Sequence, residues 1–234
     1  MRTKTLILAG AMAVLGTTAS FAQVYSQNTV GFYTINMSAG FNLIANQMNN
    51  GDNSINTIMP GTTPLNDGAQ LLKWDAGLQA FQVDADIFFA GTGWINLGTG
   101  GPSTTVLAPG EGAFVELTDP AQVVLLGDVP EGTLTRNLVA GQQIISQLTP
   151  QQLGLDASGF PANDGDTLVF WNTGRWAGER VGDFTAGYLY FVGVGWLNIN
   201  ASAPEDVVPL LGEAMFYNNT GGAATWTRTF DVSP

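Results

Sequence analysis

The sequence predicts an all-β protein built from two tandem β-sandwich or β-barrel modules of about 100 residues each, with very little helix. Three observations predict this class. Five segments recur in the same order in both halves, apolar residues alternate or form short runs, and 30 glycines and 11 prolines are spread along the chain. Short apolar runs closed by turn-forming residues are typical of strands rather than helices.

The internal repeat divides the chain. Matching residues lie 97 to 102 positions apart, and the small drifts fall in expected loops. The predicted organisation is a leader at 1–22, an extension strand at 23–29, one module at 30–130 and a second at 131–234, with a boundary near Pro130. The matching pairs are 39–48 with 140–148, 66–68 with 163–165, 71–75 with 168–172, 93–96 with 195–198, and 110–114 with 212–216.

Strands are expected wherever the period is two. Phe41, Leu43 and Ala45 share one face of such a segment, with polar or apolar residues between them. The run from Val123 to Leu126 has no polar residue, which predicts a strand covered on both faces.

Turns and helices have local signals. The Asn-Asp-Gly triplets at 66–68 and 163–165 predict tight turns, because Asn and Gly tolerate positive φ. One helical turn is expected over 54–59 with Ser54 as its cap, and a counterpart after Pro150, a residue that suits a first helical position.

The first residues indicate export. Arg2 and Lys4 precede an apolar run that ends before a small-x-small sequence at Ser20 to Ala22, as in a secretory signal peptide. Cleavage there leaves five basic and nineteen acidic residues, a charge of −14, which disfavours nucleic acid. No later stretch is long and apolar enough to span a membrane. A secreted, extracellular or cell-surface protein is expected, with a core that needs no disulfide because cysteine is absent.

The motifs resemble a known group of proteins. Residues 39–46, 72–75 and 108–115, with a Gly-aromatic-Asn-Leu-Ile opening and a Pro-Gly-x-Gly-aromatic closing, look like a β module common in exported bacterial proteins. The start of the mature chain, 24–32, is similar to uncharacterised secreted two-repeat proteins of verrucomicrobial bacteria. This resemblance implies export and β structure, and it assigns no activity.

Catalysis is not expected. Histidine and cysteine are both absent, so Ser-His-Asp and Cys-His mechanisms and zinc sites have no ligands or bases. A hydrolase that uses only carboxylates is the third-ranked hypothesis, with Glu111 and Glu213 at equivalent repeat positions as its candidates. The alternative for these two residues is a role in a turn.

No cofactor is expected apart from a possible calcium ion. Calcium needs only oxygen ligands, which short Asp- and Asn-rich loops supply. Ordinary turns in an acidic protein are the competing explanation. The candidate ligands are Asp52, Asp84, Asp86, Asp164 and Asp166.

Tryptophans favour a carbohydrate hypothesis, because sugar rings stack on exposed aromatic faces. Trp74 matches Trp171 and Trp94 matches Trp196 across the repeat, which is typical of core residues. Trp176 has no match, and Tyr188 belongs to an aromatic stretch of the second module. Trp176 and Tyr188 are therefore the predicted sugar contacts if this alternative holds.

Self-assembly is the preferred functional hypothesis. The segment before Val30 has no counterpart in the second module and could add itself as a strand to a neighbouring subunit. We thus expect a non-enzymatic extracellular structural or interaction protein that associates with itself, and the alternative is a pair of carbohydrate-binding modules. The predicted assembly residues are Val24, Tyr25, Ser26, Gln27 and Asn28.

Overall fold

The structure is a computed structural model that describes residues 29–171, 187–199 and 201–232. It is nearly all β, which confirms the predicted class. The first module contains β1 (Val30–Met37), β2 (Gly40–Asn46), α2 (Ile55–Ile58), β3 (Gln70–Leu72), β4 (Trp74–Asp75), β5 (Ala80–Phe81), β6 (Asp86–Phe89), β7 (Gly93–Asn96), β8 (Glu111–Leu117) and β9 (Ala121–Asp128). The second contains β10 (Gly132–Leu138), β11 (Gly141–Ile145), β12 (Thr167–Phe170), β13 (Tyr188–Phe191), β14 (Gly195–Asn198), β15 (Ala203–Pro204), β16 (Met215–Asn219) and β17 (Ala224–Phe230).

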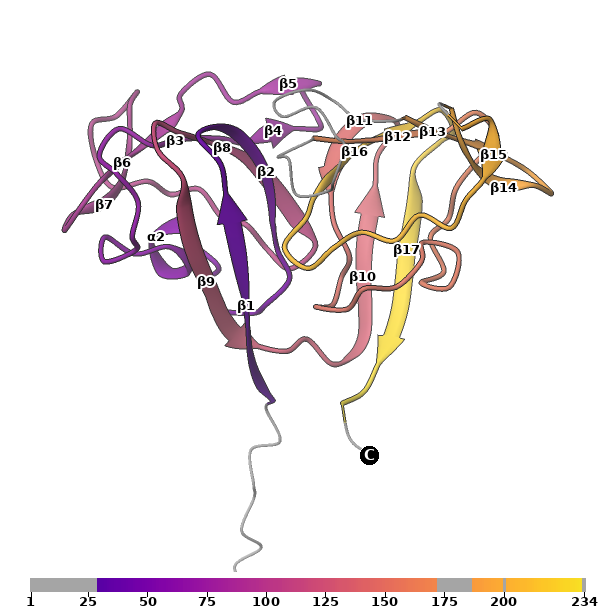
Figure 1. Ribbon diagram of the computed structural model, residues 1–234, viewed down its shortest axis with the longest axis horizontal. Helices are drawn as coiled ribbons and strands as arrows, with labels where there is room; N and C mark the ends of the chain where they lie inside the picture. Colours follow the sequence, from indigo (N-terminus) through magenta and orange to yellow (C-terminus); the bar gives the residue numbers. More distant parts are fainter. Residues whose placement is uncertain (1–28, 172–186, 200, 233–234) are drawn as a thin grey trace, which may run out of the picture.

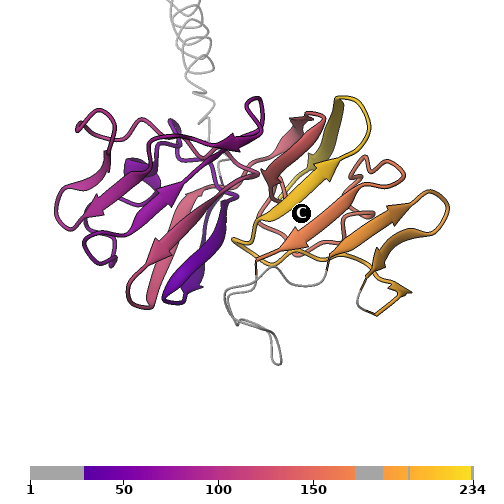
Figure 2. The same ribbon diagram turned by 90° about the horizontal axis from the view of Figure 1, so that it is seen from above.

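One sheet crosses from one module to the other (Figures 1 and 2). It has 11 strands in the order β15-β14-β13-β12-β16-β11-β8-β3-β6-β7, and β2 also pairs with β8. The modules meet where Ile145 of β11 lies opposite Glu111 of β8. The two repeats are therefore joined through backbone pairing and not only through side chains.

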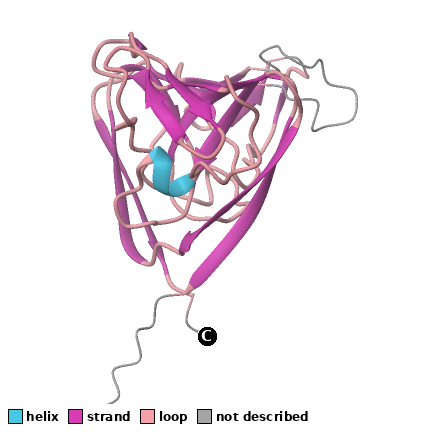
Figure 3. Cartoon of the chain, turned by 90° about the vertical axis from the view of Figure 1, so that its left-hand side faces the viewer, coloured by secondary structure: helices cyan, strands magenta, loops and turns pink. Residues whose placement is uncertain are grey.

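A second layer lies below this sheet. β1 pairs with β9 and β10 pairs with β17, each as an antiparallel two-stranded unit that we call a ladder (Figure 1). Each ladder packs its inward side chains against one half of the sheet, giving one apolar core per module. In the end view of Figure 3 the long strands converge away from the sheet, and Ile55 and Ile58 of α2 pack in the core of the first module.

Local turn signals hold in both modules. Gly68 and Gly165 have φ of 88° and 84°, as the Asn-Asp-Gly triplets predict. Asp67 Oδ1 accepts the Ala90 N–H at 2.6 Å, and the equivalent Asp164 Oδ1 accepts the Val192 N–H at 3.0 Å. Each aspartate thus ties its turn to the neighbouring β-hairpin.

Two local predictions differ from the structure. The helix at 54–59 forms as α2 with Ser54 accepting the Thr57 N–H, but its expected counterpart after Pro150 is a series of turns. Val124 and Leu126 are 53% and 56% exposed, so β9 is covered on one face and the prediction of two covered faces is wrong. Within the described residues, no helix is long and apolar enough to cross a membrane.

Candidate functional site at the module junction

The outer face of the sheet carries a third apolar cluster where the modules meet. Alternation along β2, β8 and β11 turns Leu43, Phe114 and Ile144 outward while their neighbours enter the two cores. A Cβ on Gly112 would lie 2.4 Å from the Cβ of Ala214, so glycine is needed for the two modules to approach this closely.

Two tryptophans bind across the junction in a reciprocal way. Trp74 of the first module donates its Nε1–H to the Gln142 carbonyl at 2.8 Å, and Trp171 of the second donates to the Phe41 carbonyl at 2.7 Å. Because Trp74 matches Trp171 and Phe41 matches Gln142, these are the same contact made twice. Trp74 and Trp171 were predicted to be core residues, and both are half-buried and pack against the apolar cluster at the junction. Trp94 and Trp196, each 1% exposed, are core residues as predicted.

Ring contacts follow the same reciprocal pattern. The Trp74 ring meets Phe216 edge to face at a centroid distance of 5.3 Å, and the Trp171 ring meets Phe114 at 5.2 Å. Such edge-to-face pairs are favourable beyond the area that they bury. The junction is thus an aromatic cluster to which both modules contribute equivalent residues.

The β4–β5 hairpin extends from the first module over the second. Gln79 at its tip accepts the Gln142 N–H at 2.6 Å and donates to the Gln142 carbonyl at 2.9 Å. Phe81, on the same hairpin, lies opposite Trp74 with a ring-centroid distance of 5.0 Å. These bonds fix Phe81 above the sheet, where its ring forms one wall of a groove.

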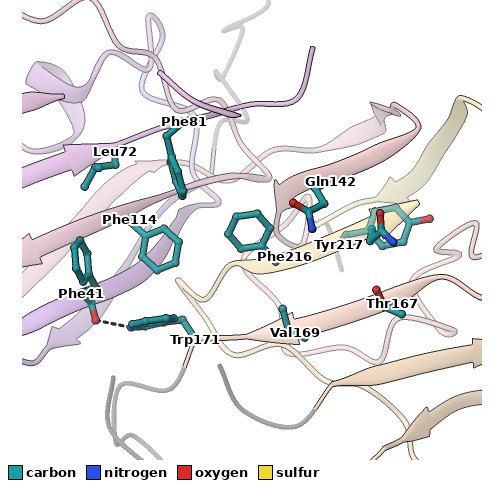
Figure 4. A pocket seen from close by; sticks show the side chains of 11 residues that line it. Phe41, Leu72, Phe81, Phe114, Gln142, Thr167, Val169, Trp171, Phe216 and Tyr217 are labelled. Atoms are coloured by element: carbon teal, nitrogen blue, oxygen red, sulfur yellow. Dashed lines mark hydrogen bonds between the residues drawn. The ribbon is translucent and has the colours of Figure 1, made fainter. Parts of the chain in front are cut away.

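This groove, the junction groove, has a volume of about 530 Å³ and is mainly apolar (Figure 4). Its size falls within the range of pockets that hold small organic ligands. Phe114 and Phe216 lie at its centre, between Phe81 on one side and Trp171 on the other. The lining residues are Phe41, Leu72, Phe81, Phe114, Gln142, Thr167, Val169, Trp171, Phe216, Tyr217 and Asn218.

A row of polar side chains crosses one end of the junction groove. Gln142 on β11 is the Cα partner of Asn218 on β16, which in turn is the partner of Thr167 on β12. We call these three residues the polar row. Across the described ranges, neither side-chain amide nor the Thr167 hydroxyl makes a hydrogen bond to the protein. Neighbouring strands lie about 4.8 Å apart, so the row offers evenly spaced free donors and acceptors.

A smaller cavity of about 250 Å³ lies next to Trp74 and contains charged groups. Lys73 and Glu111 form an ion pair at 3.0 Å, and Arg136 donates to the carbonyls of Gly110 at 2.7 Å and Ile144 at 3.2 Å. Burial lowers the pKa of the Arg136 guanidinium, and the nearby charge of Glu111 partly offsets this. Arg136 reaches both modules and therefore acts as a bond across the junction.

The two carboxylates proposed for hydrolysis have structural partners. Glu111 accepts the Ala108 N–H at 3.0 Å, and Glu213 accepts the Leu210 N–H at 2.8 Å. In each case the acceptor lies three residues after the donor, so the repeated glutamate closes the turn that precedes β8 or β16. This is the turn role that the sequence left open as the alternative.

The five aspartates proposed as calcium ligands lie in three places along the chain: Asp52 precedes α2, Asp84 and Asp86 lie at the start of β6, and Asp164 and Asp166 lie in the turn before β12. Asp52 accepts the Ser54 N–H, which lowers the pKa of its carboxyl. Asp86 and Asp166 are buried and accept from protein donors, Ser103 and Thr220 among them. In the described part of the chain, no three carboxylates gather as a metal site would require. Calcium binding stays a prediction.

The predicted sugar and assembly residues are placed only in part. Trp176 and the segment Val24 to Asn28 fall outside the described residues. Tyr188 is half-buried, donates to Glu205 Oε1 at 3.1 Å, and does not line the junction groove.

Comparison with protein-family models, with curated proteins and with solved structures gives no match. Sequence reasoning missed the groove residues Phe81, Gln142 and Asn218. A signal existed, because Phe114 and Phe216 recur at the outward position of equivalent strands, beside residues that alternate into the core.

Proposed function

We propose that this chain is a non-enzymatic binding protein whose junction groove holds a neutral oligosaccharide. The observation that carries the proposal is the combination of an aromatic floor with the free polar row. Sugars present apolar C–H faces that stack on rings and hydroxyls that need hydrogen-bond partners, and the groove supplies both. The sequence alone favoured self-assembly over carbohydrate binding. The aromatic and polar lining of the groove supports carbohydrate binding as the preferred proposal.

The charge of the groove favours a neutral glycan. Among the described residues, every side chain that lines the groove is uncharged, whereas the chain as a whole carries a net charge of −12. An anionic sugar would meet a repulsive field, and the described part of the groove holds no cation to compensate for it. Amide and hydroxyl groups such as those of Gln142, Asn218 and Thr167 suit neutral hydroxyls instead.

The test is a screen of neutral and anionic glycans by tryptophan fluorescence, followed by calorimetry on the best ligand. Phe81→Ala removes one wall and is expected to weaken binding at least about tenfold, while Asn218→Ala is expected to weaken it about fivefold. Glu116→Gln is the matched control, because Glu116 occupies the position equivalent to Asn218 and lies outside the groove. Equal affinity in all four proteins would overturn the proposal.

A further inference from the structure

The outward face of the β1–β9 ladder exposes apolar side chains. Alternation directs Tyr33 and Ile35 into the core and turns Phe32 and Val30 toward solvent, where they are 71% and 63% exposed. Phe32 lies directly opposite Leu126, which is 56% exposed. A contiguous exposed apolar patch of this kind is typical of an interaction surface.

The second module shows that the fold does not require this patch. Thr133 lies opposite Thr229 on the β10–β17 ladder, at the positions equivalent to Phe32 and Leu126. Thr227 likewise occupies the position equivalent to Val124. Both ladders pair in the same register, so an exposed threonine face is as compatible with the architecture as an apolar one. The exposed apolar residues of the β1–β9 face therefore indicate a surface that another molecule covers.

We propose that a second copy of this chain packs on the outward face of the β1–β9 ladder. Charge points to a second copy. Two copies of a strongly acidic chain repel each other over most of their surface, whereas seven of the eight outward residues of this ladder are uncharged. The eight residues are Val30, Phe32, Thr34, Asn36, Gln122, Val124, Leu126 and Asp128.

The distribution of side-chain sizes suits a two-fold contact. On each strand a large outward residue lies next to a smaller one: Phe32 precedes Thr34 on β1, and Leu126 follows Val124 on β9, where the antiparallel pairing puts the two large residues opposite each other. When two identical faces stack with opposite strand directions, the large side chains of one copy lie over the small ones of the other. The same operation places Asp128, the one acidic residue, over the Asn36 and Gln122 amides of its partner.

This surface differs from the predicted strand extension and from the junction groove. The extension hypothesis uses the edge of a sheet and residues 24–28, whereas the proposed contact uses the face of a ladder. The ladder lies in the layer below the large sheet, and the groove opens on the sheet's outer side (Figures 1 and 4). A dimer formed in this way would leave both grooves open, and it would form whether or not the grooves bind glycan.

The test is sedimentation equilibrium on the mature chain, residues 23–234, over a concentration series up to about 100 µM. The double variant Phe32→Thr/Leu126→Thr copies the second module and is expected to weaken dimerisation at least about tenfold. Thr133→Ala/Thr229→Ala changes the equivalent positions of the other ladder and should leave the dimer unchanged. Thermal unfolding checks that each variant is folded.

A chain starting at Val30 separates the competing occupants of this face. Unchanged dimerisation of the shortened chain supports the proposal. Stronger dimerisation would mean that residues 23–29 of the same chain cover the face, and lost dimerisation would mean that the extension strand makes the contact. Either of these two results would overturn the proposal. It would also be overturned by a mature chain that stays monomeric, or by a double variant that dimerises like the parent.

Discussion

The two ladders pair their strands in the same register, but they carry different side chains at equivalent positions. Toward the core, the β1–β9 ladder presents Ile35 and Leu125, whereas the β10–β17 ladder presents Arg136 and Arg228 at the same positions. Both arginines have carbonyl or amide oxygens as partners, and burial lowers the pKa of each. Strand pairing and side-chain alternation therefore define this architecture. The residues that fill the inward positions differ between the modules, apolar in one and hydrogen-bonded arginines in the other.

The largest expected loss of stability comes from the inward position at which the second module has Trp226 and the first has Val123. Trp226 is fully buried, donates to the Ser158 carbonyl at 3.0 Å and meets the Phe160 ring at 4.9 Å, whereas the first module has Val123 in its place. Trp226→Val leaves a cavity and should lower the free energy of unfolding by about 3–5 kcal/mol. Urea unfolding followed by circular dichroism measures this.

The control for that prediction is Val123→Ala in the first module, which removes much less volume and should cost about 1–2 kcal/mol. If the two variants lost equal stability, the two interiors would be equally tolerant and the comparison would fail.

Alkaline pH tests a feature that both modules have. Burial raises the pKa of Tyr33 in the first module and of Tyr217 in the second, where a hydrogen bond to Asp166 adds to the effect. Because the unfolded tyrosines ionise near pH 10 and the folded ones do not, stability is complete below pH 10 and falls above it, by about 1.4 kcal/mol per pH unit for each residue. Urea midpoints at pH 8, 10 and 11 measure the slope.

Tyr33→Phe should reduce that slope to about half, since Tyr217 would then be the remaining member of this buried pair. A slope that stays the same in this variant would show that Tyr33 ionises normally in the folded protein.

The smallest expected effect concerns the reciprocal tryptophans. Trp74→Phe and Trp171→Phe each remove one hydrogen bond across the junction, so each should cost about 1 kcal/mol. Both rings belong to one cluster through Phe114 and Phe216, so the double variant should depart from the sum of the single ones. Urea unfolding of the three proteins gives the coupling energy, and strict additivity would count against a shared cluster.

Much of the fold could be predicted because its signals are local. Alternation located β2, and the Asn-Asp-Gly triplets located two turns whose glycines have positive φ. The run from Val123 to Leu126 misled because a continuous apolar strand looks the same whether one face or both are covered. Pro150 suits a helix start, but the chain that follows it makes turns instead.

The candidate site could not be predicted in the same way. The junction groove depends on β11 meeting β8 and on the β4–β5 hairpin reaching Gln142, and both contacts join residues far apart in the sequence. Repetition predicted that Trp74 and Trp171 are core residues, but it gave no sign of which module each one contacts. Only the three-dimensional arrangement shows that each binds the other module.

The reciprocal contacts have a consequence for the history of the chain. Trp74 and Trp171 make equivalent hydrogen bonds, each to a carbonyl of the other module. Two backbone bonds follow the same pattern: the Ala45 N–H donates to the Gly212 carbonyl at 2.9 Å, and the Ser146 N–H donates to the Gly110 carbonyl at 2.8 Å. This is the pattern of an isologous interface between identical subunits, and here the two halves of one polypeptide form it. It suggests a gene fusion of a homodimeric ancestor. It also implies that two fragments, separated between Asp128 and Gly132, should find each other and restore the junction by complementation.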